Sequence, residues 1–317
     1  MTKYLVTGGA GFIGSNIGAE LLKRREQVRV LDNFATGKKE NIAQFLDDIE
    51  LVEGDLRDPR AVQQATQGID YILHQGALPS VPRSIEDPLT TNAVNIVGTL
   101  NLLIAARDAG VKRLVYASSS SVYGDNPALP KVEQMNPAPK SPYAISKLAG
   151  EHYCQAFTRV FGLQTVCLRY FNVFGPNQDP TSPYAAVIPK FVTLMMRGER
   201  PPIYGDGLQS RDFTYVANVV QANLLAVEAS EVAGEVINVA CGKRYTLLEL
   251  VDTINRILDT QIEPTFTTAR PGDVKHSQAD IGKAQKLLGF RVELDFEEGL
   301  EKTIGWYRNR LGYEQRI

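Results

Sequence analysis

The chain has 317 residues, enough for one large α/β domain or for one domain with a smaller lobe. Hydrophobic residues make up 44% and charged residues 22%, as in an ordinary soluble protein, and the formal net charge of −2 gives no reason to expect nucleic acid or an anionic membrane as a partner. No apolar run approaches the roughly 20 residues that span a bilayer. The first predicted strand begins almost at Met1 and leaves no room for a signal peptide.

The cysteines and histidines are scattered along the chain. Cys154, Cys167 and Cys241 form no CxxC pair, so we expect buried thiols in a reducing, cytoplasmic setting and no metal site. The three histidines, at positions 74, 152 and 276, are equally far apart, which argues against a metal site and against a Ser-His-Asp triad.

Residues 4–32 predict a strand, a tight glycine turn, a helix and a second strand. The strand, which begins at Tyr4, is a short apolar run without alternation, typical of a strand buried on both faces. Gly8 lets the chain turn sharply, Gly11 lets the backbone approach a pyrophosphate, and Gly14 lets the helix pack close to the strand. This spacing predicts a turn that binds a dinucleotide.

A helix begins directly after this turn, at Phe12 and Ile13, and a carboxylate closes the second strand. The free N–H groups and the positive dipole end of the helix then face the phosphates. Asp32 can accept both ribose hydroxyls of an adenosine and would repel a 2′-phosphate. These features favour NAD over NADP; the alternative is a structural turn with an incidental acid.

The glycine spacing G-x-x-G-x-x-G resembles that of the short-chain dehydrogenase/reductase superfamily, specifically its extended branch of nucleotide-sugar enzymes. The resemblance covers the chain from Tyr4 to about Tyr307. It implies that Asp55 and Leu56, which follow a predicted third strand at 49–53, hold the adenine edge. A helix N-cap at Asp55 or Asp58 is a compatible alternative. The cofactor contacts that the resemblance implies are Gly8, Gly11, Phe12, Ile13, Gly14, Asp32, Asn33, Asp55, Leu56, Gln75, Gly76, Ala77, Tyr143, Lys147 and Tyr170.

The stretch that follows a predicted helix at 60–68 and a fourth strand at 71–74 is well placed for function. Ligands bind at the carboxyl ends of strands in open parallel sheets, and Gly76 and Ala77 keep the small side chains that a cofactor needs there. Residues 78–88 contain three prolines and are predicted to be a loop, neither helix nor central strand. Ser80, Val81 and Arg83 in this loop are candidates for a substrate wall; a rigid connector is the alternative.

Helices at 92–109 and 144–162, strands at 112–117 and 163–168 and a Pro-rich loop at 125–142 continue the alternation. The expected fold class is α/β, a Rossmann-type doubly wound parallel sheet with a smaller C-terminal α/β substrate lobe. We expect an NAD-binding domain at 1–176, to which parts of the later chain return, and a mainly nucleotide-sugar-binding lobe at 177–317. Further helices are predicted near 185–197, 216–228 and 246–258, and short strands near 236–238 and 263–266.

Tyr143 and Lys147 form a Y-x-x-x-K pair that shares one face of the predicted helix. An alcohol gives up a hydride only if its proton leaves too, and a tyrosine with a pKa near 10 is a poor base at neutral pH. A neighbouring ammonium and a positive nicotinamide ring stabilise the phenolate and lower that pKa. A hydroxyl from the serine run at 118–121 supplies the third group, and the resemblance identifies it as Ser119.

Ser120 and Ser121 bear on the reaction type. In the resembled dehydratases and decarboxylases this stretch carries acids that serve elimination and decarboxylation, whereas here both positions are hydroxyls that are expected to contact the sugar. Reversible oxidation is therefore the step that the site supports. An oxidised sugar that takes back the same hydride on its other face is an epimer, which indicates a 4-epimerase.

The second half of the chain supplies the substrate contacts that the resemblance implies. Asn172 corresponds to a residue that contacts the sugar or the diphosphate. Arg211 and Arg270 lie in S-R-D-F and R-P-G-D motifs whose arginines clasp the diphosphate, since a planar guanidinium binds phosphate oxygens bidentately; surface ion pairs are the alternative. The uridine and ribose contacts are Val187, Tyr204 and Asp273.

Ser277 occupies the position that gates the room beside the sugar's 2-substituent in the resembled family. A tyrosine there suits glucose and galactose, while a small residue admits an N-acetyl group. The sequence therefore looks most like the epimerases that prefer UDP-N-acetylglucosamine and UDP-N-acetylgalactosamine. A small gate also admits smaller sugars, so exclusivity does not follow.

These patterns predict an NAD-dependent UDP-hexose 4-epimerase that works through a transient 4-keto sugar. UDP-glucose and UDP-glucuronate are alternative substrates, and a dehydratase, a decarboxylase and a non-catalytic NAD-binding scaffold are the alternative functions. The resemblance implies a homodimer in which helices 92–109 and 144–162 pair with their copies. Both helices are amphipathic and could equally bury their apolar faces in the sheet packing.

Overall fold

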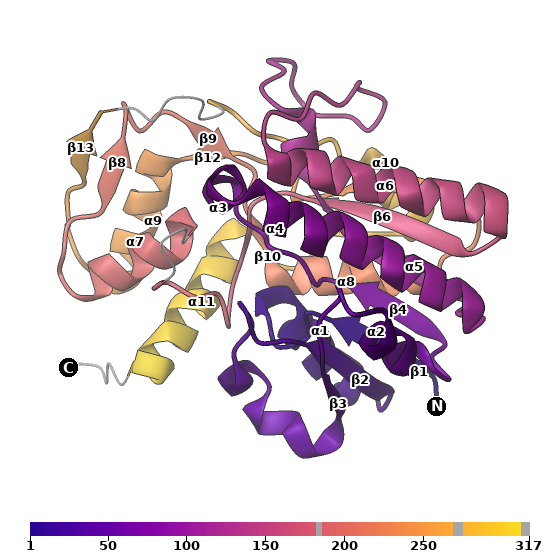
Figure 1. Ribbon diagram of the computed structural model, residues 1–317. Coiled ribbons are helices and arrows are strands. Elements are labelled where there is room, and N and C mark those ends of the chain that lie inside the picture. The colour runs from indigo at the N-terminus through magenta and orange to yellow at the C-terminus, as the bar shows by residue number, and fades with distance from the viewer. Residues whose placement is uncertain (182–185, 269–274, 312–317) are drawn as a thin grey trace.

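A seven-stranded parallel sheet forms the centre of the computed structural model, which describes residues 1–181, 186–268 and 275–311 (Figure 1). In sheet order the strands are β11 (Glu235–Val239), β6 (Gln164–Tyr170), β5 (Arg113–Ser119), β4 (Tyr71–His74), β1 (Lys3–Thr7), β2 (Gln27–Asp32) and β3 (Glu50–Glu53). From β1 the chain builds the sheet outward first through β2 and β3, and then in the other direction from β4. The order therefore reverses between β1 and β4, and the carboxyl ends of these strands are where open sheets of this kind bind ligands.

Helices cover both faces of the sheet. On one face lie α2 (Pro59–Thr66), α5 (Gly98–Asp108) and α6 (Pro142–Phe161), and on the other lie α1 (Phe12–Lys23) and α8 (Val216–Glu228). Successive residues of β1 serve opposite faces: Leu5 packs in the cluster under α5, and Val6 packs in the cluster under α1. This two-sided burial explains why the strand lacks alternation in the sequence. Figure 1 shows α5 and α6 running side by side.

The expectation of a loop at residues 78–88 is wrong, because α3 (Val81–Glu86) and α4 (Pro88–Asn92) form there. Each proline that enters these helices lies in the first turn, where its missing N–H would have no partner inside the helix anyway. Ser80 caps α3 by accepting a hydrogen bond from the N–H of Arg83 (3.1 Å), and Asp87 caps α4 by accepting one from Thr90 (3.0 Å). The helical path then continues through a π-helical segment, η3 (Ala93–Val97), into α5.

The chain beyond residue 176 contributes to two regions. β11 and α8 return to the central sheet, where Arg113 of β5 donates hydrogen bonds to three carbonyls at the end of α8 and so ties this helix to the sheet. The remaining elements build a lobe beside the sheet. Besides β7 (Val173–Phe174), which lies just before residue 176, they are α7 (Val187–Met196), β8 (Pro202–Tyr204), β9 (Ser210–Arg211), β10 (Thr214–Tyr215), β12 (Tyr245–Thr246), α9 (Leu247–Leu258), β13 (Thr265–Thr267) and α11 (Phe296–Leu311). The helix α10 (Gly282–Leu288) packs against β11 and α8.

In the described part of the chain, the segment Pro88–Asp108 has the length and mean hydropathy (1.4) of a membrane span. Core helices give the same signal, and this segment lies against α2 and α6, where Leu102 and Leu103 are fully buried. Its apolar residues are therefore accounted for in part by packing within the protein.

Candidate active site

The glycine turn brings the ends of β1 and β4 into contact. Gly8 has a left-handed backbone (φ +65°), and its N–H donates to the carbonyl of Leu31 (2.8 Å). A Cβ atom at Gly8 would lie 2.7 Å from the Cα of Gly76, and one at Gly14 would lie 2.2 Å from the carbonyl oxygen of Gly8. No side chain fits at either position, and this is the close approach that the sequence predicts.

The N-terminus of α1 is left open by this turn. Gly11 is the N-cap, no side chain caps the helix, and the first turn contains no acidic residue. Phe12 and Ile13 pack against the core, so their side chains point away from the turn that they begin. Unpaired N–H groups at a helix N-terminus attract phosphate oxygens, and the residues present therefore fit the pyrophosphate of a dinucleotide.

Asp32 lies at the end of β2 and is 7% exposed. Its two oxygens accept hydrogen bonds from the N–H groups of Ala10 (2.9 Å) and Phe34 (2.8 Å), while burial raises the pKa of the carboxyl. The backbone contacts hold the carboxylate at the mouth of the glycine turn, and each oxygen keeps a second lone pair for a ribose hydroxyl.

Asn33 and Asp55 face each other across the ends of β2 and β3. Asn33 Nδ2 donates to Asp55 (2.7 Å), and Arg57 binds the same carboxylate through Nε and Nη2, which helps to lower its pKa to about 2. Leu56 is buried against Gly98 of α5. The helix N-cap of α2 is Asp58, which accepts from the N–H of Arg60 (2.9 Å).

Gln75 and Tyr170 meet over the ends of β4 and β6. The Gln75 amide contacts the Tyr170 hydroxyl and Asn223 of α8, and Asn223 Nδ2 donates to the same hydroxyl (2.8 Å). Sequence reasoning missed Asn223, because nothing in its local pattern distinguishes it from a polar residue on a helix surface. The N–H of Gly76 donates to the side chain of Thr7 (3.2 Å), and the next residue, Ala77, also has a small side chain.

Ser119, Tyr143 and Lys147 come together where β5 meets α6. Burial raises the pKa of the Tyr143 phenol, and the nearby Ser119 hydroxyl opposes this rise. Lys147 is 4% exposed, its Nζ donates to the carbonyl of Ala117 (2.7 Å), and burial is the main cause that lowers its pKa to about 8. Pro142 lies in the first turn of α6 and Ser141 caps it, which fixes Tyr143 at the helix start.

Ser120 and Ser121 begin the short helix η4 (Ser120–Tyr123) at the end of β5. The Ser121 Oγ is buried and has no hydrogen-bond partner within the described residues. A buried hydroxyl rarely stays unpaired, so this atom is available to a bound molecule.

β9 and the segment that begins at Lys275 form one strip at the edge of the lobe. The N–H of Ser277 donates to the carbonyl of Ser210 (3.0 Å), and Arg211 Nη1 donates to the carbonyls of Ser210 (3.0 Å) and Lys275 (3.1 Å). Asp212, which sequence reasoning did not single out, is fully buried and binds the N–H groups of Cys241, Gly242 and Ala279. The backbone bond between Ser277 and Ser210 places Ser277 beside the residue that precedes Arg211.

Three further predicted contacts lie at the edges of the lobe. Asn172 has a left-handed backbone (φ +36°) and donates to the carbonyl of Asp212 (3.1 Å), Val187 begins α7, and Tyr204 ends β8. Arg270 and Asp273 lie outside the described residues.

The fold and this site define a dinucleotide-binding enzyme with a tyrosine–lysine–serine centre. A family model described as "NAD dependent epimerase/dehydratase family" matches residues 4–240. The chain belongs to this family, and NAD is its cofactor.

Similar proteins cover the chain from end to end. A structure of UDP-N-acetylglucosamine 4-epimerase from Methanobrevibacter ruminantium M1, in complex with UDP-N-acetylmuramic acid, is 43% identical, with a TM-score of 0.93 and coverage of 98% of this chain and 99% of that one. A putative UDP-glucose 4-epimerase of Methanocaldococcus jannaschii is 38% identical over 307 residues, which are 96% of this chain and 98% of the relative. UDP-glucuronic acid decarboxylase 1 of Xenopus tropicalis is 32% identical over 319 residues, 98% of this chain and 73% of the relative.

Proposed function

We propose that this protein is an NAD-dependent isomerase that interconverts UDP-hexoses differing in configuration at carbon 4. Relatives that match nearly the whole chain carry the names of 4-epimerases, and this chain brings together a half-buried tyrosine, a half-buried serine and a buried lysine where β5 meets α6. The proximity of Tyr143 and Ser119 is the observation that carries the proposal, because it puts a proton acceptor at the start of α6 beside a hydroxyl at the end of β5.

Each residue of the centre has a defined task. Bound NAD, held at the glycine turn and Asp32, would supply the reversible hydride transfer at carbon 4 of the sugar. Tyr143 takes the proton of the 4-hydroxyl and later gives it back, and Ser119 holds the reacting oxygen. Lys147 supplies a positive charge that favours the phenolate form of Tyr143 and binds the ribose hydroxyls. Arg211 and Arg270 hold the diphosphate while the keto-sugar turns.

The hydroxyls at Ser120 and Ser121 favour epimerisation over dehydration or decarboxylation. A dehydratase needs an acid and a base at the sugar besides the tyrosine, and in this stretch the chain offers only the serine hydroxyls. The unpaired Oγ of Ser121 is suited to a hydrogen bond with a sugar hydroxyl. A hydroxyl with a pKa far above neutrality does not act as a general acid or base by itself.

UDP-N-acetylglucosamine and UDP-N-acetylgalactosamine are the substrates that we favour. Ser277 has a small side chain and is half-buried beside β9, which leaves room for an N-acetyl group at carbon 2. The relative of known structure that is 43% identical is named for UDP-N-acetylglucosamine and holds another UDP-linked N-acetyl sugar. UDP-glucose and UDP-glucuronate remain the alternative substrates.

One incubation tests both the reaction and the substrate. The purified protein is mixed, without added cofactor, with UDP-N-acetylglucosamine or with UDP-glucose, and the products are resolved by proton NMR. Faster formation of UDP-N-acetylgalactosamine supports 4-epimerisation with retained NAD and the role of Ser277. Faster formation of UDP-galactose keeps the reaction and overturns the assignment of Ser277. No conversion of these two sugars or of UDP-glucuronate, even with NAD supplied, overturns the proposed function.

We also propose that the protein works in the cytoplasm as a homodimer that pairs through α5 and α6. The described part of the chain has exposed apolar side chains on this face, among them Val97 of η3 and Tyr153 of α6. A charge at Val97 in a dimer interface would be desolvated, so Val97→Glu is expected to give monomers in light scattering. Leu208→Glu is the control, because Leu208 is equally exposed but lies in the lobe. A monomeric wild-type protein contradicts the proposal.

A further inference from the structure

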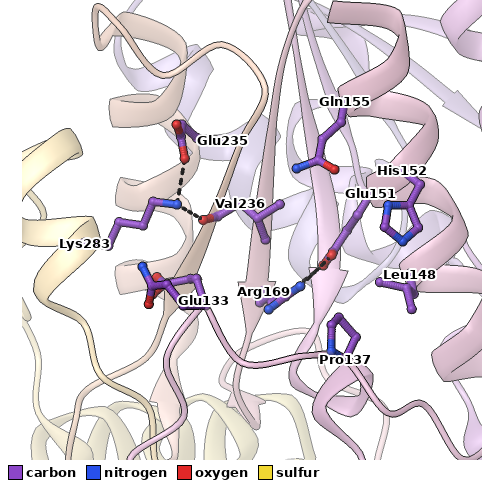
Figure 2. Close-up of a pocket in the computed structure, with 11 residues that line it drawn as sticks. Glu133, Pro137, Leu148, Glu151, His152, Gln155, Arg169, Glu235, Val236 and Lys283 are labelled. Atoms are coloured by element: carbon purple, nitrogen blue, oxygen red, sulfur yellow. Dashed lines mark hydrogen bonds and ion pairs between the residues drawn. The ribbon is translucent and has the colours of Figure 1, made fainter. Parts of the chain in front are cut away.

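A buried ion pair lies beneath the predicted catalytic centre and lines a cavity of about 240 Å³ (Figure 2). Arg169 of β6 binds Glu151 of α6 through two parallel hydrogen bonds of 2.8 Å each, from Nε to Oε1 and from Nη2 to Oε2. Glu151 is 2% exposed and Arg169 is 3% exposed. The bidentate geometry fixes both side chains more firmly than a single contact would.

The same carboxylate also reaches the catalytic strand. Ser118 Oγ donates to Glu151 Oε1 (2.5 Å), and Ser118 directly precedes Ser119. Three consecutive residues at the end of β5 thus face three residues at four-residue steps along α6, and the first two pairs are hydrogen-bonded. The pairs are Ala117 with Lys147, Ser118 with Glu151, and Ser119 with Tyr143.

We propose that Glu151 is a positioning residue for the reaction: through Ser118 it fixes the end of β5 against α6, and through its charge it keeps Lys147 in the ammonium form. This inference rests on the proposed function for the roles of Ser119 and Lys147. Glu151 contacts Ser118 and Arg169. Glu151 acts on Ser119 through its hydrogen bond to the neighbouring Ser118, and it acts on Lys147 through its charge.

The charges around Lys147 agree with this role. Burial lowers the pKa of Lys147 to about 8, while Cys154 and Glu151 oppose the decrease. His74 of β4 also faces Lys147, but burial lowers its pKa to about 3, so it is neutral at physiological pH. The ring of Tyr116 lies 5.0 Å from Nζ and offers its negative face, and Tyr143 carries no charge while its phenol is protonated. Loss of the Glu151 charge should therefore lower the pKa of Lys147 further.

The cavity provides a matched control. Glu235 lines the same cavity and also binds a cation, Lys283, at 2.7 Å, as Figure 2 shows. Glu235 belongs to β11, at the sheet edge beyond β6, and its carboxylate pairs with Lys283 of α10 rather than with a residue of the centre. Glu235→Gln and Glu151→Gln are thus the same chemical change in one cavity, and only the second touches the catalytic strand.

The first experiment titrates Lys147 directly. Full-length protein is prepared with ¹³C-labelled lysine side chains and equal NAD content, and the Lys147 signal is assigned with Lys147→Arg. Two charges about one helical turn apart in a partly screened interior change each other's pKa by about one unit, so Glu151→Gln should shift the titration of Lys147 downward by that amount. Glu235→Gln should leave it unchanged. An unchanged titration in Glu151→Gln, or an equal shift in both variants, overturns the charge link.

This titration needs no substrate, so it separates the present inference from the proposed function. If the wild type epimerises no sugar but the Lys147 titration shifts, the function fails and the charge link stands. If Glu151→Gln does not fold because Arg169 is left without its partner, the paired variant Glu151→Gln/Arg169→Gln removes the stranded charge. Because this variant also removes the positive charge of Arg169, it is expected to lower the Lys147 titration by less than Glu151→Gln does, and an unchanged titration overturns the link.

The second experiment tests the positional link. Ser118→Ala removes one hydrogen bond but leaves the ion pair intact, so kcat should fall about fivefold with little change in KM. The alkaline limb of the kcat profile should keep its position in Ser118→Ala and should move to lower pH in Glu151→Gln. Unchanged kcat in Ser118→Ala overturns the role of the serine link. Loss through KM alone also overturns it, because that change would reflect substrate binding rather than placement of Ser119.

Discussion

Gly14 and Gly8 are so close that a Cβ atom on Gly14 would lie 2.2 Å from the carbonyl oxygen of Gly8. Real side chains do not approach a backbone oxygen to this distance, so the first turn of α1 can lie against the end of β1 only with glycine at position 14. This contact fixes the distance between the open N–H groups of α1 and the carboxyl end of β1. The fit of the protein for the NAD pyrophosphate therefore requires that residue 14 has no Cβ atom.

Gly14→Ala is expected to reduce both stability and cofactor retention. The added methyl must push α1 away from β1, and forced repacking of this kind costs about 1–3 kcal/mol. The measurements are the melting temperature and the NAD released on denaturation. Gly18→Ala lies on the same helix, where the new Cβ would meet Phe45 at an ordinary 3.6 Å, and it should behave like the wild type. Equal NAD retention in Gly14→Ala would contradict this account.

Tyr143→Phe is expected to lower kcat by about 10²- to 10⁴-fold, the usual contribution of a general base. The ring stays in place and only the hydroxyl near Ser119 is lost, so the NAD content should not change. Tyr153→Phe makes the same change on the exposed side of α6 and serves as the control. Near-normal turnover in Tyr143→Phe would remove this residue from the mechanism.

The parts of the fold that were predictable are those with local signatures. The glycine turn, the pair Tyr143 and Lys147, and the buried strands each leave a pattern in consecutive residues, and the structure has the turn, the helix and the strands where they were expected. The prolines of residues 78–88 misled the prediction, because their effect depends on whether each falls in the first turn of a helix or later.

Partners that are distant in sequence could not be predicted from such patterns. Asn223 reaches Tyr170 across 53 residues, and Asp212 binds the backbone of Ala279 across 67 residues. Glu151 resembles an ordinary acid on a helix until the fold places Arg169 against it. In each case the partner is fixed by the way the strands and helices pack.

Ser277→Tyr is expected to change substrate preference rather than the chemistry. A phenol at this position would fill the room beside the 2-substituent, and one bulky group in a pocket is worth about 10- to 200-fold in discrimination. The ratio of kcat/KM for UDP-N-acetylglucosamine over UDP-glucose should fall by that range. The backbone bond from residue 277 to Ser210 does not depend on the side chain, so the strip should stay folded. A fall of equal size for both sugars would show damage to the site instead of a gate.

His74 predicts how stability depends on pH. It is 1% exposed, its ring nitrogens bond Thr7 and Thr99, and burial lowers its pKa from 6.5 to about 3. Between pH 6.5 and pH 3 the His74 imidazole binds a proton in the unfolded chain but stays neutral in the folded protein. The contribution of neutral, buried His74 to the free energy of unfolding is therefore complete above pH 6.5 and is lost as the pH falls toward 3. At pH 5 the loss is about 2 kcal/mol, from about 1.4 kcal/mol per pH unit.

Urea unfolding at pH 7.5 and pH 5 should therefore show a smaller pH effect, by about that amount, in His74→Gln than in the wild type. His152→Gln replaces an exposed histidine and should keep the wild-type pH effect, and an equal effect in all three proteins would mean that His74 is protonated in the folded state.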